Sequence, residues 1–260
     1  MYGIKLILLS IFRLNINNYL TLVSLVPNVR YSVFIILNKS HKEMNKEELN
    51  EIENQLSFPK GKNGIKLGEK MNTSNIEMTL SSINALDLKN DCTVLEIGHG
   101  SCGHLYQVLN NAKNIRYIGL EVSKTMQQEA MRINQELLKE KEAAFLLYDG
   151  QKMDFRDNRM DRIFTVNTIY FWKEPIEFLK EIYRILKSDG LFVLTFAHKF
   201  FMEQLPFVGE KFNLFSPQDI RALIKKSSFS NIQIHNYQDE VTSKSGEQVT
   251  RAYSVVVLKK

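Results

Sequence analysis

The strongest constraint on the fold is a pattern that begins at Thr93, where short apolar runs alternate with stretches whose apolar residues recur at helical spacing. Apolar runs this short are typical of strands buried on both faces of a parallel sheet. Repeated strand–helix units predict a doubly wound α/β fold with right-handed crossovers. The strands are predicted at Thr93–Ile97, Arg116–Leu120, Ala144–Tyr148, Arg162–Asn167 and Leu191–Phe196.

The end of the chain departs from this alternation. Ser216-Pro217-Gln218-Asp219 has the N-cap, the N1 proline and the N3 acid of a capping box, which predicts a helix that runs to about Ser227. Two strands are predicted after it, at Asn231–Tyr237 and Arg251–Leu258. Because no crossover helix separates these strands, they must pair antiparallel.

Local signals predict the ends of two helices. Ser123 is predicted to cap the helix that contains Met126 and Ala130. A later helix is predicted to end at Ser188-Asp189-Gly190, where Gly190 would take the left-handed conformation.

The segment before Thr93 divides into an extension and an N-terminal part of the fold. Residues 44–73 are predicted to form a helix around Lys46–Leu56, followed by a glycine-containing loop over Ser57–Asn72 that acts as a lid. The main domain is predicted over residues 74–260. Residues 1–43 are apolar and basic, and none of their apolar runs approaches the roughly 18 residues of a spanning helix. We interpret Met44 as the natural start and expect no stable membrane insertion. A peripheral membrane anchor is the competing interpretation.

Composition limits the partners. The net charge is +5 and the pI is about 9.0, but five basic residues and one acidic residue lie within residues 1–43, so most of this charge belongs to the extension. No concentrated basic stripe remains to follow phosphates, and no nucleic-acid partner is expected. Cys92 and Cys102 cannot build a disulfide framework, which suits a cytoplasmic protein. The scattered histidines show no metal-ligand spacing, and no metal is expected.

A glycine-rich turn follows the first strand of the alternating pattern. Gly98 and Gly100 permit a tight turn in which backbone N–H groups approach a ligand closely. Twenty-one residues beyond Gly100, Glu121 ends the second strand, where a carboxylate can accept hydrogen bonds from ribose hydroxyls. The two features together indicate an adenosine ligand. As an acid at the end of a strand, Glu121 is expected to be exposed, so that its removal should cost little stability.

Two observations separate this site from a dinucleotide site. Glu96 lies two residues before Gly98, where its charge would repel a pyrophosphate but suits a cationic amino-acid ligand. The second observation is the predicted antiparallel hairpin at the end of the chain, because dehydrogenases of this architecture usually end on a parallel strand.

From about Ser74 to Leu258 the chain resembles the class I S-adenosylmethionine-dependent methyltransferases, and within them the type 11 group. The resemblance implies a mostly parallel, Rossmann-like sheet of seven strands with an antiparallel C-terminal hairpin. It also implies that Glu96 and the backbone of Gly98–Gly100 serve the methionine end of the cofactor, with Glu121 at the ribose. Segment 148–155 resembles the motif that binds adenine, and Asn167 matches a position beside the methyl donor. The remaining cofactor-binding residues implied by the resemblance are Val122, Asp149, Gly150 and Gln151.

One position departs from the family. The third glycine of the common GxGxG form is Cys102 here, with Gly103 one place later. A cysteine is small enough to be tolerated, and methyl transfer needs no covalent enzyme intermediate, so we interpret Cys102 as a small filler rather than as a nucleophile.

Candidate acceptor residues follow the fourth and fifth strands. Tyr170, Phe171 and Trp172 either enclose an apolar acceptor or pack against the helix that follows. His198 is the best-placed group for deprotonating an acceptor, although a lone histidine is weak evidence. The Phe-rich segment 197–215 is predicted to cover the substrate.

The sequence therefore predicts methyl transfer from S-adenosyl-L-methionine to a small, partly apolar acceptor by in-line displacement. A sensor or partner subunit that binds S-adenosylmethionine without catalysis is the alternative from another class, and an NAD(P)-binding protein is a third. The acceptor atom and the oligomeric state stay open.

Overall fold

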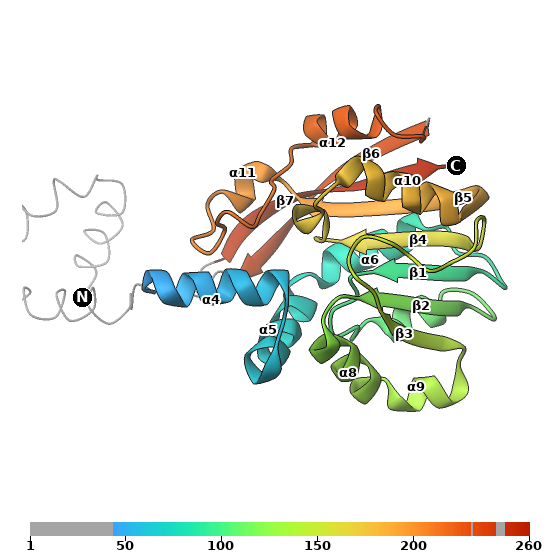
Figure 1. Cartoon of the computed structure of the whole chain (residues 1–260), viewed down its shortest axis with the longest axis horizontal. Helices are drawn as coiled ribbons and strands as arrows, with labels where there is room; N and C mark the ends of the chain where they lie inside the picture. Colours follow the sequence, from blue (N-terminus) through green and yellow to red (C-terminus); the bar gives the residue numbers. More distant parts are fainter. Residues whose placement is uncertain (1–43, 230, 243–247) are drawn as a thin grey trace, which may run out of the picture. The chain divides into compact units, whose positions relative to one another are not determined.

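The computed structural model describes residues 44–229, 231–242 and 248–260. Its centre is a seven-stranded sheet in the order β3-β2-β1-β4-β5-β7-β6 (Figure 1). All neighbours are parallel except the pairs β5–β7 and β7–β6, which are antiparallel. The prediction of a doubly wound sheet with an antiparallel hairpin is confirmed. The strands are β1 (Thr93–Ile97), β2 (Arg116–Glu121), β3 (Ala143–Leu147), β4 (Met160–Val166), β5 (Leu186–Ala197), β6 (Asn231–Thr242) and β7 (Gln248–Lys259).

The helices of the described residues precede, connect and follow these strands. They are α4 (Lys46–Ser57), α5 (Gly61–Ser74), α6 (Ile76–Ala85), α7 (Leu105–Leu109), α8 (Lys124–Ile133), α9 (Gln135–Glu140), the 3₁₀ turn η2 (Ile169–Phe171), α10 (Pro175–Ile185), α11 (Lys199–Met202) and α12 (Pro217–Ile224). Within this part of the chain, none of them is long and apolar enough to cross a bilayer.

Helices cover both faces of the sheet. Ser82 of α6 donates a hydrogen bond to Thr195 of β5, so α6 lies on the face that Thr195 occupies. Phe192 of the same strand points to the opposite face, because successive side chains alternate. There its ring packs on Phe229, which also contacts Tyr183 of α10. The core therefore has the layered arrangement that the strand–helix alternation predicts.

Two predicted helix starts are confirmed by their caps. The Ser123 side chain accepts a hydrogen bond from the backbone N–H of Met126 at the start of α8. Ser216 and Asp219 form a reciprocal capping box at the start of α12. Each cap satisfies N–H groups that the first turn of a helix leaves without partners.

The prediction of a loop over Ser57–Asn72 is wrong, because most of this segment forms α5. Its internal glycines lie four residues apart and therefore share a helix face. A Cβ at Gly64 would lie 2.8 Å from the carbonyl carbon of Pro59, and one at Gly68 would lie 2.7 Å from Sδ of Met126. These glycines permit close helix packing and do not break the helix.

The predicted end of the later helix at Ser188-Asp189-Gly190 is also wrong. Helix α10 ends at Ile185, and β5 begins at once at Leu186. Asp189, not Gly190, takes the left-handed conformation, with φ of +64°. Gly190 is needed for space, because a Cβ there would lie 2.6 Å from Cγ of Leu186.

Candidate cofactor site

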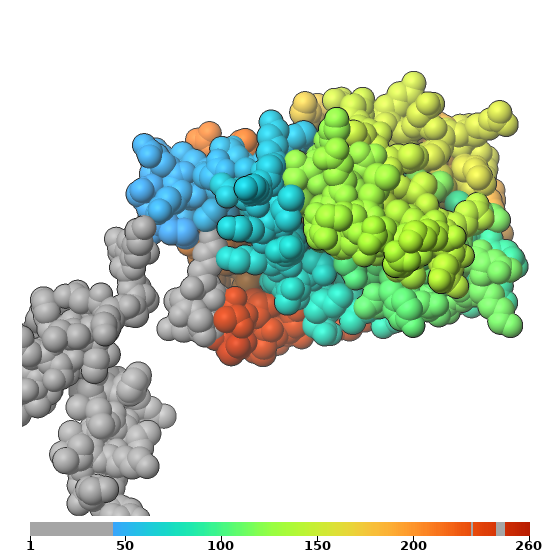
Figure 2. All heavy atoms as spheres, turned by 90° about the horizontal axis from the view of Figure 1, so that it is seen from below, coloured from blue at the N-terminus to red at the C-terminus, as the bar shows by residue number. Residues whose placement is uncertain are grey.

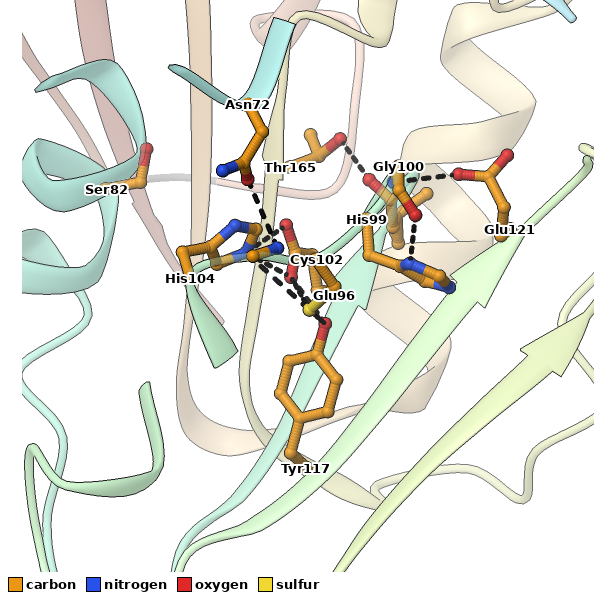
Figure 3. Close-up of polar contacts among 12 residues, drawn as sticks. Asn72, Ser82, Glu96, His99, Gly100, Cys102, His104, Tyr117, Glu121 and Thr165 are labelled. Carbon is orange, nitrogen blue, oxygen red and sulfur yellow. Dashed lines mark hydrogen bonds and ion pairs between the residues drawn. The ribbon is translucent and has the colours of Figure 1, made fainter. Parts of the chain in front are cut away.

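The glycine-rich turn lies at the carboxyl end of β1, beside β2 and the loop after β4 (Figure 3). The Gly98 N–H donates to the Leu120 carbonyl oxygen at 2.8 Å, so the turn leaves the sheet in register with β2. Gly98 has φ of +73°, and a Cβ there would overlap the methyl group of Thr168. Gly100 has φ of +56°, and its Cβ position faces open space. The turn thus presents backbone atoms to a region where a ligand has room.

Glu121 ends β2 and holds the turn from the side. Its Oε2 accepts a hydrogen bond from the Gly100 N–H at 3.0 Å, and its Oε1 accepts from the N–H groups of Val122 and Ser123 at 2.9 and 3.0 Å. The residue is only 5 % exposed, so the expectation of an exposed strand-end acid is wrong. Because a carboxylate has about four acceptor positions, room remains for a further donor. This geometry fits a ribose hydroxyl, which stays a prediction.

Asp149 and Gly150 lie next to Val122, at the end of β3. The Asp149 Oδ1 accepts hydrogen bonds from the N–H groups of Lys152 and Gln151 at 2.9 and 2.8 Å. These bonds hold the pKa of the Asp149 carboxyl below its usual value. Gly150 has φ of +81°, and its Cβ position lies 3.3 Å from Cγ1 of Val122. The residues predicted for ribose and adenine are thus brought together at one edge of the sheet, while their contacts with the cofactor remain predictions.

Glu96 lies beneath the turn in a buried polar cluster (Figure 3). Its carboxylate oxygens are 3.0 and 2.9 Å from Nε2 of His104, and Tyr117 donates its hydroxyl hydrogen to Oε2 at 2.5 Å. Glu96 is 3 % exposed. Burial acts to raise the pKa of the Glu96 carboxyl, but the neighbouring His104 lowers it below its usual value. Glu96 carries a negative charge that is paired inside the protein.

Cys102 joins the same cluster from within the turn. Its φ of +50° is the left-handed conformation that a third glycine would adopt easily. Its Sγ lies 3.2 Å from the Tyr117 hydroxyl and 4.0 Å from a Glu96 oxygen. Burial raises the pKa of the Cys102 thiol, which argues for the filler interpretation and against a nucleophile.

Glu96, Cys102 and His104 also form a group that could hold a metal ion, because one possible ligand atom from each lies within 4.8 Å of the others. The scattered positions of the histidines in the sequence gave no indication of this proximity. Nε2 of His104 lies 2.9 Å from a Glu96 oxygen, while Sγ of Cys102 lies 4.0 Å from both of these atoms.

Helix α5 covers the turn from the N-terminal side. The Asn72 side chain accepts a hydrogen bond from the Gly103 N–H at 3.2 Å. Ser123 donates its hydroxyl hydrogen to the Pro59 carbonyl oxygen at 2.5 Å, and the Gly61 N–H donates to Oγ1 of Thr125 at 3.2 Å. Figure 2 shows α5 lying against α8 on this side of the molecule. The lid predicted over residues 44–73 is therefore helical, and it touches the turn through Asn72.

The aromatic residues after β4 are mostly enclosed by the protein. The Tyr170 hydroxyl donates to Oδ1 of Asn167 at 3.0 Å and accepts from the Ala197 N–H at 2.7 Å. The Trp172 Nε1–H donates to Oγ1 of Thr168 at 3.1 Å. Both aromatic residues are buried, which favours packing over contact with an acceptor. Phe171 is partly exposed and packs on Phe212, with ring centroids 4.8 Å apart.

Asn167 and His198 follow β4 and β5. Asn167 has φ of +58°, and its Oδ1 also accepts from the Ala197 N–H at 3.2 Å. Nε2 of His198 lies 2.7 Å from Oγ of Ser254, whose hydroxyl donates to Oδ1 of Asn236 at 2.7 Å. Because that hydroxyl hydrogen is committed to Asn236, Nε2 carries the imidazole hydrogen and Nδ1 is the acceptor. Burial lowers the pKa of His198, so the ring is neutral near pH 7.

Sequence reasoning missed two residues that shape the site, because Thr168 carries no motif signal and His104 is one of several scattered histidines. Asn72 falls within the predicted lid segment, although this segment is helical and not the predicted loop. The nearest signal was the pair Glu96 and His104 on either side of the glycine-rich turn, an acid and a base that only the folded turn brings into contact.

Comparisons with known proteins agree with the fold. Residues 95–194 match the family described as a methyltransferase domain. An uncharacterized methyltransferase of Bacillus subtilis, YdaC, is 26 % identical over 128 residues, which is 49 % of this chain and 68 % of that protein. Phosphoethanolamine N-methyltransferase 2 of Caenorhabditis elegans is 26 % identical over 160 residues, 58 % of this chain but only 35 % of that protein.

A solved S-adenosylmethionine-dependent methyltransferase from Aquifex aeolicus has the same fold. It superposes with a TM-score of 0.53 at 20 % identity and covers 74 % of this chain and 97 % of that one. Residues 95–194 therefore form a methyltransferase domain, and the chain is an S-adenosylmethionine-dependent methyltransferase whose sheet has the class I fold. Its cofactor is S-adenosylmethionine, as the resemblance implied.

Proposed function

We propose that the enzyme methylates a small acceptor with apolar surface, held between the glycine-rich turn and a cover formed by residues 199–215. The observation that carries this proposal is the cover itself. The Lys199 N–H donates to the Phe215 carbonyl oxygen at 2.9 Å, so the segment closes into a loop. The Asn213 N–H donates to the Tyr170 carbonyl oxygen at 3.0 Å and ties this loop to the aromatic residues after β4.

Helix α4 supports the cover from the other side. Oε1 of Glu53 accepts a hydrogen bond from the Lys211 N–H at 2.8 Å, and Nζ of Lys211 lies 2.5 Å from Oδ1 of Asn54. Six partly buried apolar side chains of the cover pack against the hydrophobic core: Phe201, Leu205, Val208, Phe212, Leu214 and Phe215. A cover of this composition excludes water and favours an acceptor with apolar groups.

S-adenosylmethionine supplies an activated methyl group, whose carbon forms a bond to the acceptor atom as its bond to sulfur breaks and S-adenosylhomocysteine is left. The chain's task is to position both molecules and exclude water. In this proposal Glu121 and Asp149 orient the cofactor, and the aromatic cover holds the acceptor. His198 takes a proton at Nδ1 where the acceptor must lose one, because its neutral form and its bond to Ser254 leave that nitrogen as an acceptor.

Formation of S-adenosylhomocysteine, followed by mass spectrometry with a panel of small amines, phenols and thiols and with a metabolite extract, tests this proposal. We expect turnover with at least one acceptor that carries apolar groups. Binding of S-adenosylmethionine with no turnover on any acceptor would instead favour a sensor or partner subunit. Turnover only on large polymers would contradict the small-acceptor proposal.

A further inference from the structure

The buried cluster beneath the glycine-rich turn has members before, within and after that turn. Glu96 lies on β1 before the turn, Cys102 lies within it, and His104 caps α7 after it. Tyr117 reaches the cluster from β2. The cluster therefore joins the strand before the turn, the turn itself and the residue after it to β2 (Figure 3).

The charges within this cluster are already balanced. The Glu96 carboxylate contacts Nε2 of His104 through both oxygens, so a buried anion meets a buried cation. Burial acts to lower the pKa of His104, but the Glu96 carboxylate raises it well above its ordinary value. The other titratable groups that face the pair are Tyr117 and Cys102, both neutral because burial raises their pKa values, and His99, whose pKa burial lowers.

A carboxylate whose charge is neutralised by a buried partner attracts a charged ligand only weakly. Glu96 is 3 % exposed; its Oε2 has polar contacts with His104, Tyr117 and Cys102, and its Oε1 contacts His104. Breaking a buried pair to free one partner is strongly unfavourable, since it leaves an uncompensated charge. A cationic ammonium group would therefore find no free partner in Glu96.

We propose that Glu96, Cys102, His104 and Tyr117 form a buried clasp that sets the shape of the cofactor-binding turn, and that Glu96 acts through this clasp without contacting the cofactor. His104 is then a positioning residue for S-adenosylmethionine. Cys102 replaces the third glycine of the family because its side chain completes the clasp from a left-handed backbone position. This inference rests on the assignment of the turn to the cofactor.

Two single variants test the clasp. Their effects on cofactor affinity are opposite under the two hypotheses, namely that Glu96 contacts the cofactor directly and that it acts through the clasp. His104→Leu removes the hydrogen-bond donor and frees the Glu96 charge. We expect its affinity for S-adenosylhomocysteine to fall at least about tenfold, the equivalent of one charge-assisted hydrogen bond. Glu96→Gln keeps the shape and can still accept from His104, so we expect a loss of at most about threefold. If Glu96 bound the ammonium group directly, His104→Leu would bind as tightly as the parent or tighter, and Glu96→Gln would lose at least about tenfold.

The measurements are isothermal titration of the full chain with S-adenosylhomocysteine and thermal unfolding without ligand. His104→Gln restores an N–H donor, and we expect it to return within about threefold of the parent. Titrations at a temperature well below every unfolding midpoint separate positioning from stability, because a merely structural residue would leave the affinity of the folded variant unchanged. His235→Gln, at an exposed position of β6, is the matched control. If His104→Leu does not fold, Glu96→Gln alone decides between the two roles.

Each outcome has a defined meaning. A parent protein that does not bind S-adenosylhomocysteine would contradict the assignment of the turn to the cofactor. A parent that binds together with a folded, equally tight His104→Leu would overturn the clasp alone. One tightly held zinc ion per chain in the purified parent would also overturn it, because metal coordination would then replace the hydrogen bonds.

Discussion

Replacing Glu121 by alanine should destabilise the empty protein as well as weaken cofactor binding. The carboxylate accepts three backbone hydrogen bonds, of which the one from Ser123 is buried and those from Gly100 and Val122 are partly buried. Leaving a buried donor unsatisfied costs about 1–3 kcal/mol, and water can replace much of the lost interaction at the other two. We therefore expect a loss of roughly 2–4 kcal/mol in the free energy of unfolding.

Thermal unfolding followed by circular dichroism measures this effect. For a domain of this size each kcal/mol lowers the midpoint by about 2–4 °C, so Glu121→Ala should unfold roughly 5–15 °C below the parent. Glu136→Ala is the control, because this carboxylate is exposed and pairs with Lys139 on the same helix. Affinity for S-adenosylhomocysteine should fall at least about tenfold in Glu121→Ala. A midpoint equal to that of the parent would show that the carboxylate does not hold the turn.

Three further predictions follow from the site and the sequence. Isothermal titration should detect S-adenosylhomocysteine and not NADH at similar concentration, and tighter NADH binding would contradict the cofactor assignment. A chain that begins at Met44 should fold and bind the cofactor with the parent's affinity, because residues 44–260 hold the seven-stranded sheet and the glycine-rich turn. Aggregation or lost binding would refute this. If His198 is the base, kcat/KM should fall as the pH drops through the lowered pKa of His198, below the ordinary histidine range, and His198→Gln should abolish that acidic limb. A limb unchanged in the variant would assign it to another group.

Most of the sheet was predictable because its strands are short apolar runs with clear boundaries. The strand Thr93–Ile97 and the caps at Ser123 and Ser216 were predicted as observed. The glycines of α5 were misread because sequence patterns do not distinguish a glycine that permits close packing from one that ends a helix. Gly64 and Gly68 are of the first kind, and their partners Pro59 and Met126 are known only from the fold.

The site was predictable in position but not in its internal contacts. The spacing between Gly100 and Glu121 placed a carboxylate beside the turn, and their hydrogen bond confirms this proximity. Sequence reasoning treated Glu121 as exposed because a strand end usually faces solvent. The burial of Glu96 against His104 also went unpredicted, because contacts between an acid before a turn and a base after it depend on how the turn folds back.

The contact between Gly98 and Thr168 has a consequence for binding thermodynamics. The Thr168 methyl group occupies the space where a side chain on Gly98 would lie, and its hydroxyl accepts from Trp172. The cofactor turn and the loop that begins the acceptor side therefore lie in close contact. We expect that whichever ligand binds first orders the surface that receives the other ligand. This predicts positive cooperativity between cofactor and acceptor. Because linkage is reciprocal, each ligand must raise the affinity for the other by the same factor, whichever is titrated first.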